Sequence, residues 1–124
     1  MAASTDLWGE IDTEGPSSTP LSILREQASL LGQKTGNVIE AKVETLTISN
    51  TFVHKLLLVA PALNNYTFEL LKIIQPIQLY PVSTPASKDL RLDDEESFVK
   101  WLREQLSSDE THRIITNLLS QSRS

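Results

Sequence analysis

Apolar and polar residues alternate most regularly between residues 38 and 82, and this stretch predicts a β-sheet. Four extended segments are expected, at residues 38–48, 51–60, 66–74 and 77–82. The second, TFVHKLLLVA, is mainly apolar on both faces, which is typical of a central strand covered on two sides. In the first, the apolar positions change parity part-way along. A β-bulge near Glu44–Thr45 would reconcile its two halves.

Apolar residues at three- and four-residue steps predict three helices, one before the sheet and two after it. The first begins near Pro20, because Thr19 is suited to cap it and proline is tolerated at the first helical position. The second begins within the acidic run 93–96, where Asp93 or Asp94 is expected to cap it, and the third begins in the run 107–110. Residues 83–92 are expected to form a linker between the sheet and the second helix.

Together these elements predict an α+β fold with an antiparallel three- to four-stranded sheet, an N-terminal helix and two C-terminal helices, in the order α-β-β-β-(β)-α-α. A single domain is expected over residues 19–122. Residues 1–18 are small and polar, and they predict a disordered N-terminal tail. Leu7, Trp8 and Ile11 are apolar exceptions. They form a candidate docking motif or, alternatively, a turn that packs on the domain.

Because strands two and three carry apolar residues on both faces, something must cover the second face of the sheet. The helices could take opposite faces and give a three-layer monomer. Alternatively, all three helices could share one face, which the short turn after the first helix favours. The other face would then bind a protein partner or a second copy. The candidate interface residues are Val53, Leu57, Val59, Leu71 and Ile73.

Composition narrows the function classes without naming one. The chain has 124 residues, 40% of them apolar, no cysteine and a net charge of −5. Disulfides and thiolate metal sites are excluded, and affinity for nucleic acid is disfavoured because it depends on Lys and Arg. The N-terminus lacks the basic and apolar regions of a signal peptide, and no apolar run reaches the length of a membrane span. We therefore expect a cytoplasmic protein that binds neither membranes nor nucleic acid.

Candidate chemistry is sparse. His54 lies on an apolar strand face, where a hydrogen-bonded structural role is expected. Asp109 and His112 lie one helical turn apart, but they lack the further ligands of a zinc site. The acidic run 93–96 fits helix capping better than cation binding. No nucleophile elbow or phosphate-binding loop is present, so no catalytic residue and no cofactor is predicted.

The order of helix, three strands and helix resembles that of double-stranded-RNA-binding domains. Those domains use a basic helix start to contact phosphates, whereas this chain has Asp93 to Glu96 there, so the charge excludes that function. A non-catalytic protein-binding module, such as an adaptor or chaperone-like subunit, is the first hypothesis. An acidic inhibitor or immunity-type protein against a basic toxin or nuclease is the second. A small enzyme or ligand-binding domain with a pocket at the sheet–helix seam is the third.

Overall fold

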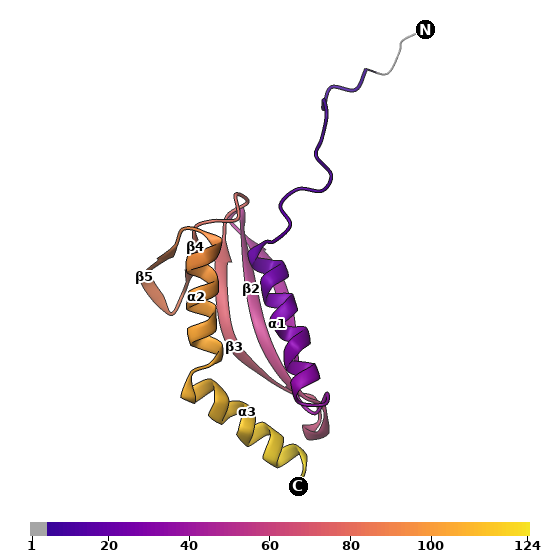
Figure 1. Ribbon diagram of the computed structural model, residues 1–124, viewed down its shortest axis with the longest axis vertical. Coiled ribbons are helices and arrows are strands. Elements are labelled where there is room, and N and C mark those ends of the chain that lie inside the picture. The colour runs from indigo at the N-terminus through magenta and orange to yellow at the C-terminus, as the bar shows by residue number, and fades with distance from the viewer. Residues whose placement is uncertain (1–4) are drawn as a thin grey trace.

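The computed structural model describes residues 5–124 (Figure 1). The predicted α+β class and element order are confirmed, with an N-terminal helix, an antiparallel sheet and two C-terminal helices. Residues 5–17 extend from the domain as an exposed chain, and residues 1–4 of the predicted tail lie outside the described residues. The elements are α1 (Pro20–Lys34), β1 (Glu40–Ile48), β2 (Thr51–Ala60), η1 (Pro61–Leu63), β3 (Tyr66–Gln75), β4 (Val82–Thr84), β5 (Ser87–Leu92), α2 (Glu95–Leu106) and α3 (Asp109–Ser122).

The sheet is a meander in which the strands lie in chain order, each antiparallel to its neighbours. Ser49 and Asn50 join β1 to β2 and have φ angles of 48° and 65°, which suit a tight hairpin turn. The register between these strands is unbroken over all nine residues of β1. The bulge predicted near Glu44–Thr45 is therefore wrong. The apolar residues that follow it, Leu46 and Ile48, are simply exposed.

The irregularity lies instead between β2 and β3. Leu56 is opposite Leu71, whereas Leu57 is opposite Glu69, so Leu70 is the extra residue. Beyond a bulge of this kind, side chains that would have pointed to one face of the sheet point to the other face. Leu70 and Leu71 consequently both pack against the core beneath the helices.

The segment 83–92 is not a linker, which corrects the prediction. It forms most of the β4–β5 hairpin, so the sheet has five strands rather than three or four. Val82 and Leu92 are buried in the core, with exposed fractions of 0% and 6%. Because the hairpin is short and its register is irregular, only Leu90 and Leu92 mark it as a strand in the apolar pattern.

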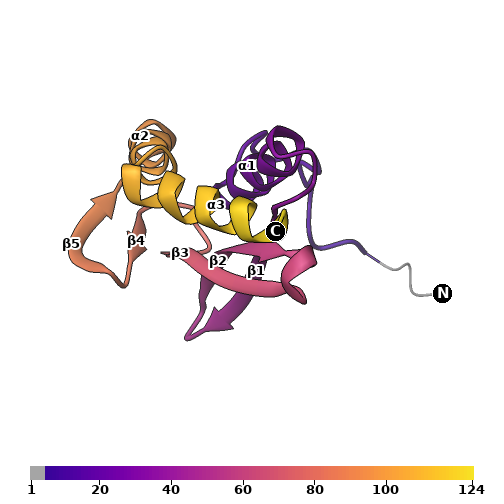
Figure 2. The same cartoon turned by 90° about the horizontal axis from the view of Figure 1, so that it is seen from below.

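All three helices lie on one face of the sheet, as Figure 2 shows. Leu56 packs with residues of α1 and α2, and Leu58 and Ala60 pack with Leu118 of α3. These three strand residues alternate along β2 and so share a face. The alternative of a three-layer monomer is wrong. We call the covered side of the sheet the helix face and the other side the open face.

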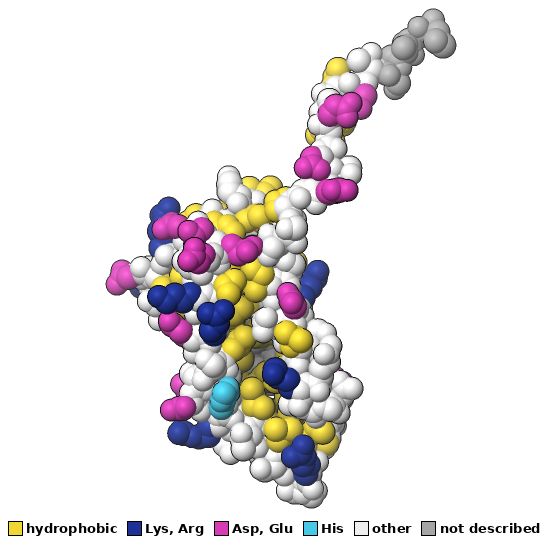
Figure 3. Space-filling model, viewed as in Figure 1, with side chains coloured by type: hydrophobic (Ala, Val, Ile, Leu, Met, Phe, Trp, Pro, Cys, Tyr) yellow, Lys and Arg dark blue, Asp and Glu magenta, His cyan; other side chains and the backbone are white. Residues whose placement is uncertain are grey.

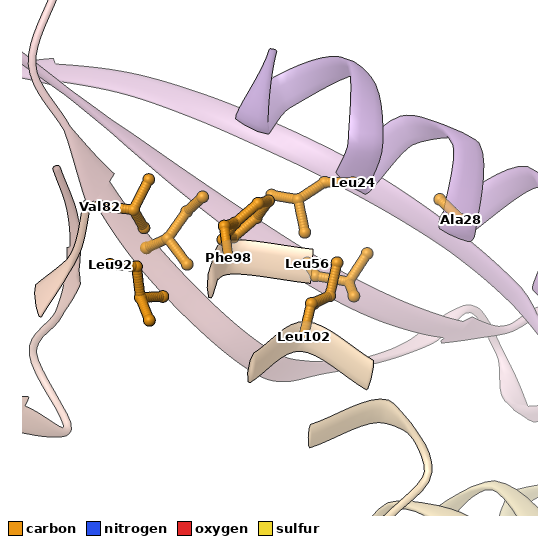
Figure 4. Packing of buried hydrophobic residues seen from close by; sticks show 8 residues of the cluster. Leu24, Ala28, Leu56, Val82, Leu92, Phe98 and Leu102 are labelled. Atoms are coloured by element: carbon orange, nitrogen blue, oxygen red, sulfur yellow. The ribbon is translucent and has the colours of Figure 1, made fainter. Parts of the chain in front are cut away.

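Phe98 of α2 occupies the centre of the larger core cluster (Figure 4). It is fully buried and lies against Leu24 from α1 and Leu56 from the sheet. Trp101, one turn further along α2, stacks on Phe98 with ring centroids 6.2 Å apart, and it remains half-buried. The centre of the core is therefore Phe98, and Trp101 lies at its edge.

Side chains cap the helices where the sequence predicts. The Thr19 hydroxyl accepts a hydrogen bond from the Ser22 amide at 3.1 Å, and the Ser22 hydroxyl accepts one from the Thr19 amide at 2.8 Å. Asp94 caps α2 by accepting from the Ser97 amide at 2.8 Å. This bond holds the pKa of Asp94 below its usual value. The acidic run 93–96 thus begins a helix, as predicted.

Candidate functional site

A groove opens between α1 and the α2–α3 pair on the helix face of the sheet. Its volume is about 330 Å³. In the space-filling view, hydrophobic side chains form a band between α1 and α2 (Figure 3). The apolar floor and walls of the groove include Ile23, Ala28, Leu30, Leu56, Leu58, Leu70 and Ile115.

Local sequence explains why the groove stays open. The bulge adds Leu70 to its floor, between the two helices that line its sides. The chain then turns sharply between α2 and α3, where Thr111 donates its hydroxyl to the Gln105 carbonyl at 2.7 Å. Ser108 caps α3 by accepting from the Thr111 amide at 3.1 Å. This turn carries α3 across one end of the groove rather than alongside α1 (Figure 1).

The side chains of two cationic residues and one histidine line the same end of the groove. They are Lys34, Arg103 and His112, here called the basic rim. They come from the last turns of α1 and α2 and the first turn of α3. No Asp or Glu of the described chain lines the groove. Of the ion pairs formed within residues 5–124, none includes a member of the rim. The rim is therefore a local positive site on a chain of net charge −5.

The rim also has a structural role, since cations near helix C-termini stabilise the helix by about 0.3–1 kcal/mol each. That role accounts for Lys34 and Arg103 separately. It does not require them to face one apolar opening together with His112. An opening with apolar walls and positive charge at one end is suited to a ligand that is apolar and acidic.

In the part of the chain that the structure describes, no hydroxyl that lines the groove is hydrogen-bonded to a side-chain base. Ser107, Thr111 and His112 all line the groove, which brings hydroxyls and an imidazole into one region. However, the Ser107 hydroxyl donates to the Arg103 carbonyl at 2.6 Å, and the Thr111 hydroxyl donates to a backbone carbonyl as well. Within residues 5–124, no hydrogen bond joins His112 to either hydroxyl. A nucleophile paired with a base is thus missing from this part of the chain.

The structural role predicted for His54 is confirmed. It is 2% exposed, and its ring stacks on Phe52. Its Nε2 lies 3.1 Å from the Gln75 Oε1, and its Nδ1 lies 2.9 Å from the Thr45 hydroxyl. Because the Gln75 amide donates to the Pro76 carbonyl, Oε1 is left to accept from Nε2–H. Burial disfavours the charged ring and holds the pKa of His54 below its usual value.

The structure divides the five predicted interface residues between the two faces. Val53, Leu57 and Val59 lie on the open face, as predicted. Leu71 and Ile73 do not, because the bulge at Leu70 reverses the alternation of β3 beyond it. Both contribute to the core beneath the helices, and Ile73 is 0% exposed.

The central residues of the open face are also less exposed than predicted. Val53 and Leu57 are only 5% and 6% exposed although no helix covers them. Leu57 lies between Lys42 and Glu69 on the neighbouring strands. Glu69 in turn pairs with Lys55 at 3.7 Å. Long charged side chains therefore shield the central strand.

The predicted docking motif in the tail is described by the structure but touches no other element of the fold. Leu7, Trp8 and Ile11 are 89%, 83% and 61% exposed. Asp6 accepts a hydrogen bond from the Trp8 amide at 2.9 Å, which is a local turn within the tail. The three apolar side chains are thus presented to solvent.

The pair Asp109 and His112 lies exposed on α3. Within residues 5–124, no three His, Asp or Glu side chains are grouped so as to ligate a metal ion. None of the helices formed by these residues has the length and apolar character of a membrane span.

Sequence reasoning placed a possible pocket at the sheet–helix seam, but it did not identify the basic rim. Arg103 lies 69 positions after Lys34 in the sequence, and His112 follows nine positions later. Each is an ordinary residue of its own helix, so no local pattern links the three. Comparison of the chain with protein-family models, curated proteins and solved structures finds no match.

Proposed function

We propose that this chain is a non-catalytic protein-binding module that holds an apolar, acidic segment of a partner in the groove between α1 and α2–α3. The observation that carries the proposal is the combination of apolar walls with the basic rim at one opening. Amphipathic helices bind such grooves through apolar anchors at three- and four-residue steps, with charges outside them. Acidic residues flanking the anchors would pair with Lys34 and Arg103 and could accept a hydrogen bond from the His112 ring.

The groove is a better candidate than the open face because it joins a cavity with apolar walls to a cluster of basic side chains. On the open face Leu46 is 45% exposed, but the central Leu57 is only 6% exposed. Binding through the open face would first require Lys and Glu side chains to move away from the central strand, at a cost in desolvation. The predicted interface through Val53, Leu57 and Val59 stays a prediction.

Selection of random peptides displayed on phage tests the proposal. We expect peptides captured by the intact chain to carry two or three apolar residues at helical spacing, flanked by Asp or Glu. Leu30→Glu places a carboxylate at the groove mouth and should abolish their capture. Leu46→Glu is the matched control, because Leu46 is 45% exposed on the open face. Peptides that bind both variants equally would contradict the proposal.

A small apolar acid, such as a fatty acid, is a second candidate ligand. The observation that favours it is the volume of about 330 Å³, which lies at the lower end of the range of about 300–1,000 Å³ for small-molecule sites. Calorimetric titration with dodecanoate distinguishes the two. Saturable binding that is lost in Arg103→Glu would support this ligand class, and absence of heat at two well-separated temperatures would exclude it.

A further inference from the structure

The tail and the groove are complementary. Between residues 5 and 17, the tail carries four carboxylates, from Asp6, Glu10, Asp12 and Glu14, and no Lys or Arg. It also carries the three apolar side chains of Leu7, Trp8 and Ile11. Two of these, Leu7 and Trp8, are more exposed than any other large apolar residue described in the chain. The tail therefore has the chemistry that the groove selects, namely apolar anchors among negative charges.

We propose that the groove receives residues 6–14 of a second copy of this chain, so that two copies exchange their tails. The proposal uses the site of the proposed function and identifies an occupant for it. Leu7 and Ile11 are four residues apart and Trp8 is three before Ile11, so one helical turn would place all three on one side. That side would enter the apolar part of the groove, and the carboxylates would face the basic rim.

Chain geometry favours a second copy over the chain's own groove. The tail leaves the domain beyond the N-terminus of α1, whereas the basic rim lies at the opposite end of that helix (Figure 1). α1 has 15 residues and is about 22 Å long. Glu10 is nine residues before Thr19 and could span about 30 Å when fully extended, so the tail is long enough to reach either groove.

Folding back onto the same chain would, however, need the chain to reverse direction before α1, whereas residues 5–17 lead away from the domain (Figure 1). Even then, Glu14 could not reach the rim, because its five-residue connection spans only about 17 Å. A second copy is free of this limit, since its tail enters from outside. Reciprocal exchange is self-complementary and closes as a two-fold dimer.

Sedimentation of the full chain tests the exchange. At micromolar concentration we expect a species of twice the 13.8 kDa monomer mass, in equilibrium with monomer. Trp8→Ala should weaken the association at least about 30-fold, as removal of a buried aromatic anchor does at protein interfaces. Ile77→Ala is the control, because Ile77 is 72% exposed but lies in neither the tail nor the groove.

Charge reversal tests the rim. Arg103→Glu should weaken the dimer and remove much of its sensitivity to salt, and Glu10→Lys combined with Arg103→Glu should restore part of the affinity. Arg113→Glu makes the same charge change on α3 outside the groove and should have no such effect.

Mixing two defective chains distinguishes exchange from folding back. Trp8→Ala retains an intact groove, and Leu30→Glu retains an intact tail. Each alone should associate weakly, whereas a mixture should form a heterodimer with one tail seated, tighter than either homodimer but weaker than the unaltered dimer.

Three results would overturn the proposal. The first is a chain that is monomeric at its highest soluble concentration. The second is a dimer that is indifferent to both Trp8→Ala and Arg103→Glu. The third is a mixture of Trp8→Ala and Leu30→Glu that, at concentrations high enough for one seated tail to hold two chains, associates no more strongly than either variant alone. The peptide selection described above is independent of all three, so acidic peptides captured through the groove by a monomeric chain would leave the proposed function standing.

Discussion

Leu56 and Leu57 are adjacent, almost equally buried and on opposite faces of the sheet, which makes them a matched pair for measuring how each face contributes to stability. Leu56 is 3% exposed and packs under α1 and α2. Leu57 is 6% exposed, and the side chains beside it on the neighbouring strands are those of Lys42 and Glu69. The perturbation is truncation of each leucine to alanine.

The two truncations remove the same number of methyl and methylene groups, so the transfer contribution is similar for both, at about 2 kcal/mol. They differ in what can fill the space that is left. Around Leu56 the helices and strands are packed and relax only partly, which adds a cavity term and brings the expected loss to about 4 kcal/mol. Around Leu57, the flexible Lys42 and Lys55 side chains can settle into the space. The expected loss there is about 2–3 kcal/mol.

Urea denaturation measures both losses. With a denaturant dependence of about 2 kcal/mol per molar urea, the midpoint should fall by about 2 M for Leu56→Ala and about 1–1.5 M for Leu57→Ala. Leu46→Thr is the control on the open face, because Leu46 is 45% exposed and threonine keeps the preference for a strand. Its effect should stay within about 0.5 kcal/mol.

Two results would refute this reasoning. An unchanged midpoint for Leu57→Ala would mean that Leu57 is not shielded by the charged side chains. A loss equal to that of Leu56→Ala would mean that the open face is as rigidly covered as the helix face. The measurement should be repeated at two protein concentrations, because a midpoint for the unaltered chain that rises with concentration reports association of the folded state.

Three further predictions concern the pH response, the core and the first helix. The pKa of His54 in the folded state lies below the 6.5 of an unperturbed histidine, so the unfolded state binds the proton more readily. This contribution to stability should be full above pH 6.5 and should decrease as the pH falls below it. Urea titrations at several pH values should show a smaller pH dependence for His54→Gln. Phe98→Ala should lower the free energy of unfolding by about 3–5 kcal/mol, whereas Trp101→Ala should lower it by only about 2 kcal/mol because that ring is half-buried. Equal urea midpoints for the two variants would contradict this order. Thr19→Ala removes the cap of α1 and should lower stability by about 1 kcal/mol, whereas Thr67→Ala, on an exposed strand position, should change the thermal midpoint less.

The sequence predicts most of the elements because their signals are local. Thr19 and Asp94 cap helices through side chains three residues away, and alternation over ten residues marks β2. The bulge at Leu70 could not be predicted, because a run of apolar residues is compatible with either parity. That single residue is why the predicted placement of Ile73 on the open face is wrong.

The groove is harder to predict than the fold for a similar reason. The basic rim joins residues from three helices, and it forms only because all three helices share one face of the sheet. Apolar pattern alone left open whether they do. The acidic tail, by contrast, is visible in the sequence as a run of carboxylates around Leu7, Trp8 and Ile11.

The chain-order arrangement of the sheet has a consequence for how the domain folds. Every strand pairs with the strand next to it in sequence, so no strand pairing has to wait for a distant segment to arrive. The entropy lost in closing each connection is correspondingly small. We expect rapid formation of the β1–β2–β3 meander, with a folding rate typical of mixed α/β domains rather than of β-sandwiches. The slower event should be the docking of α1 and α2, which are separated by the whole sheet and meet through Leu24 and Phe98.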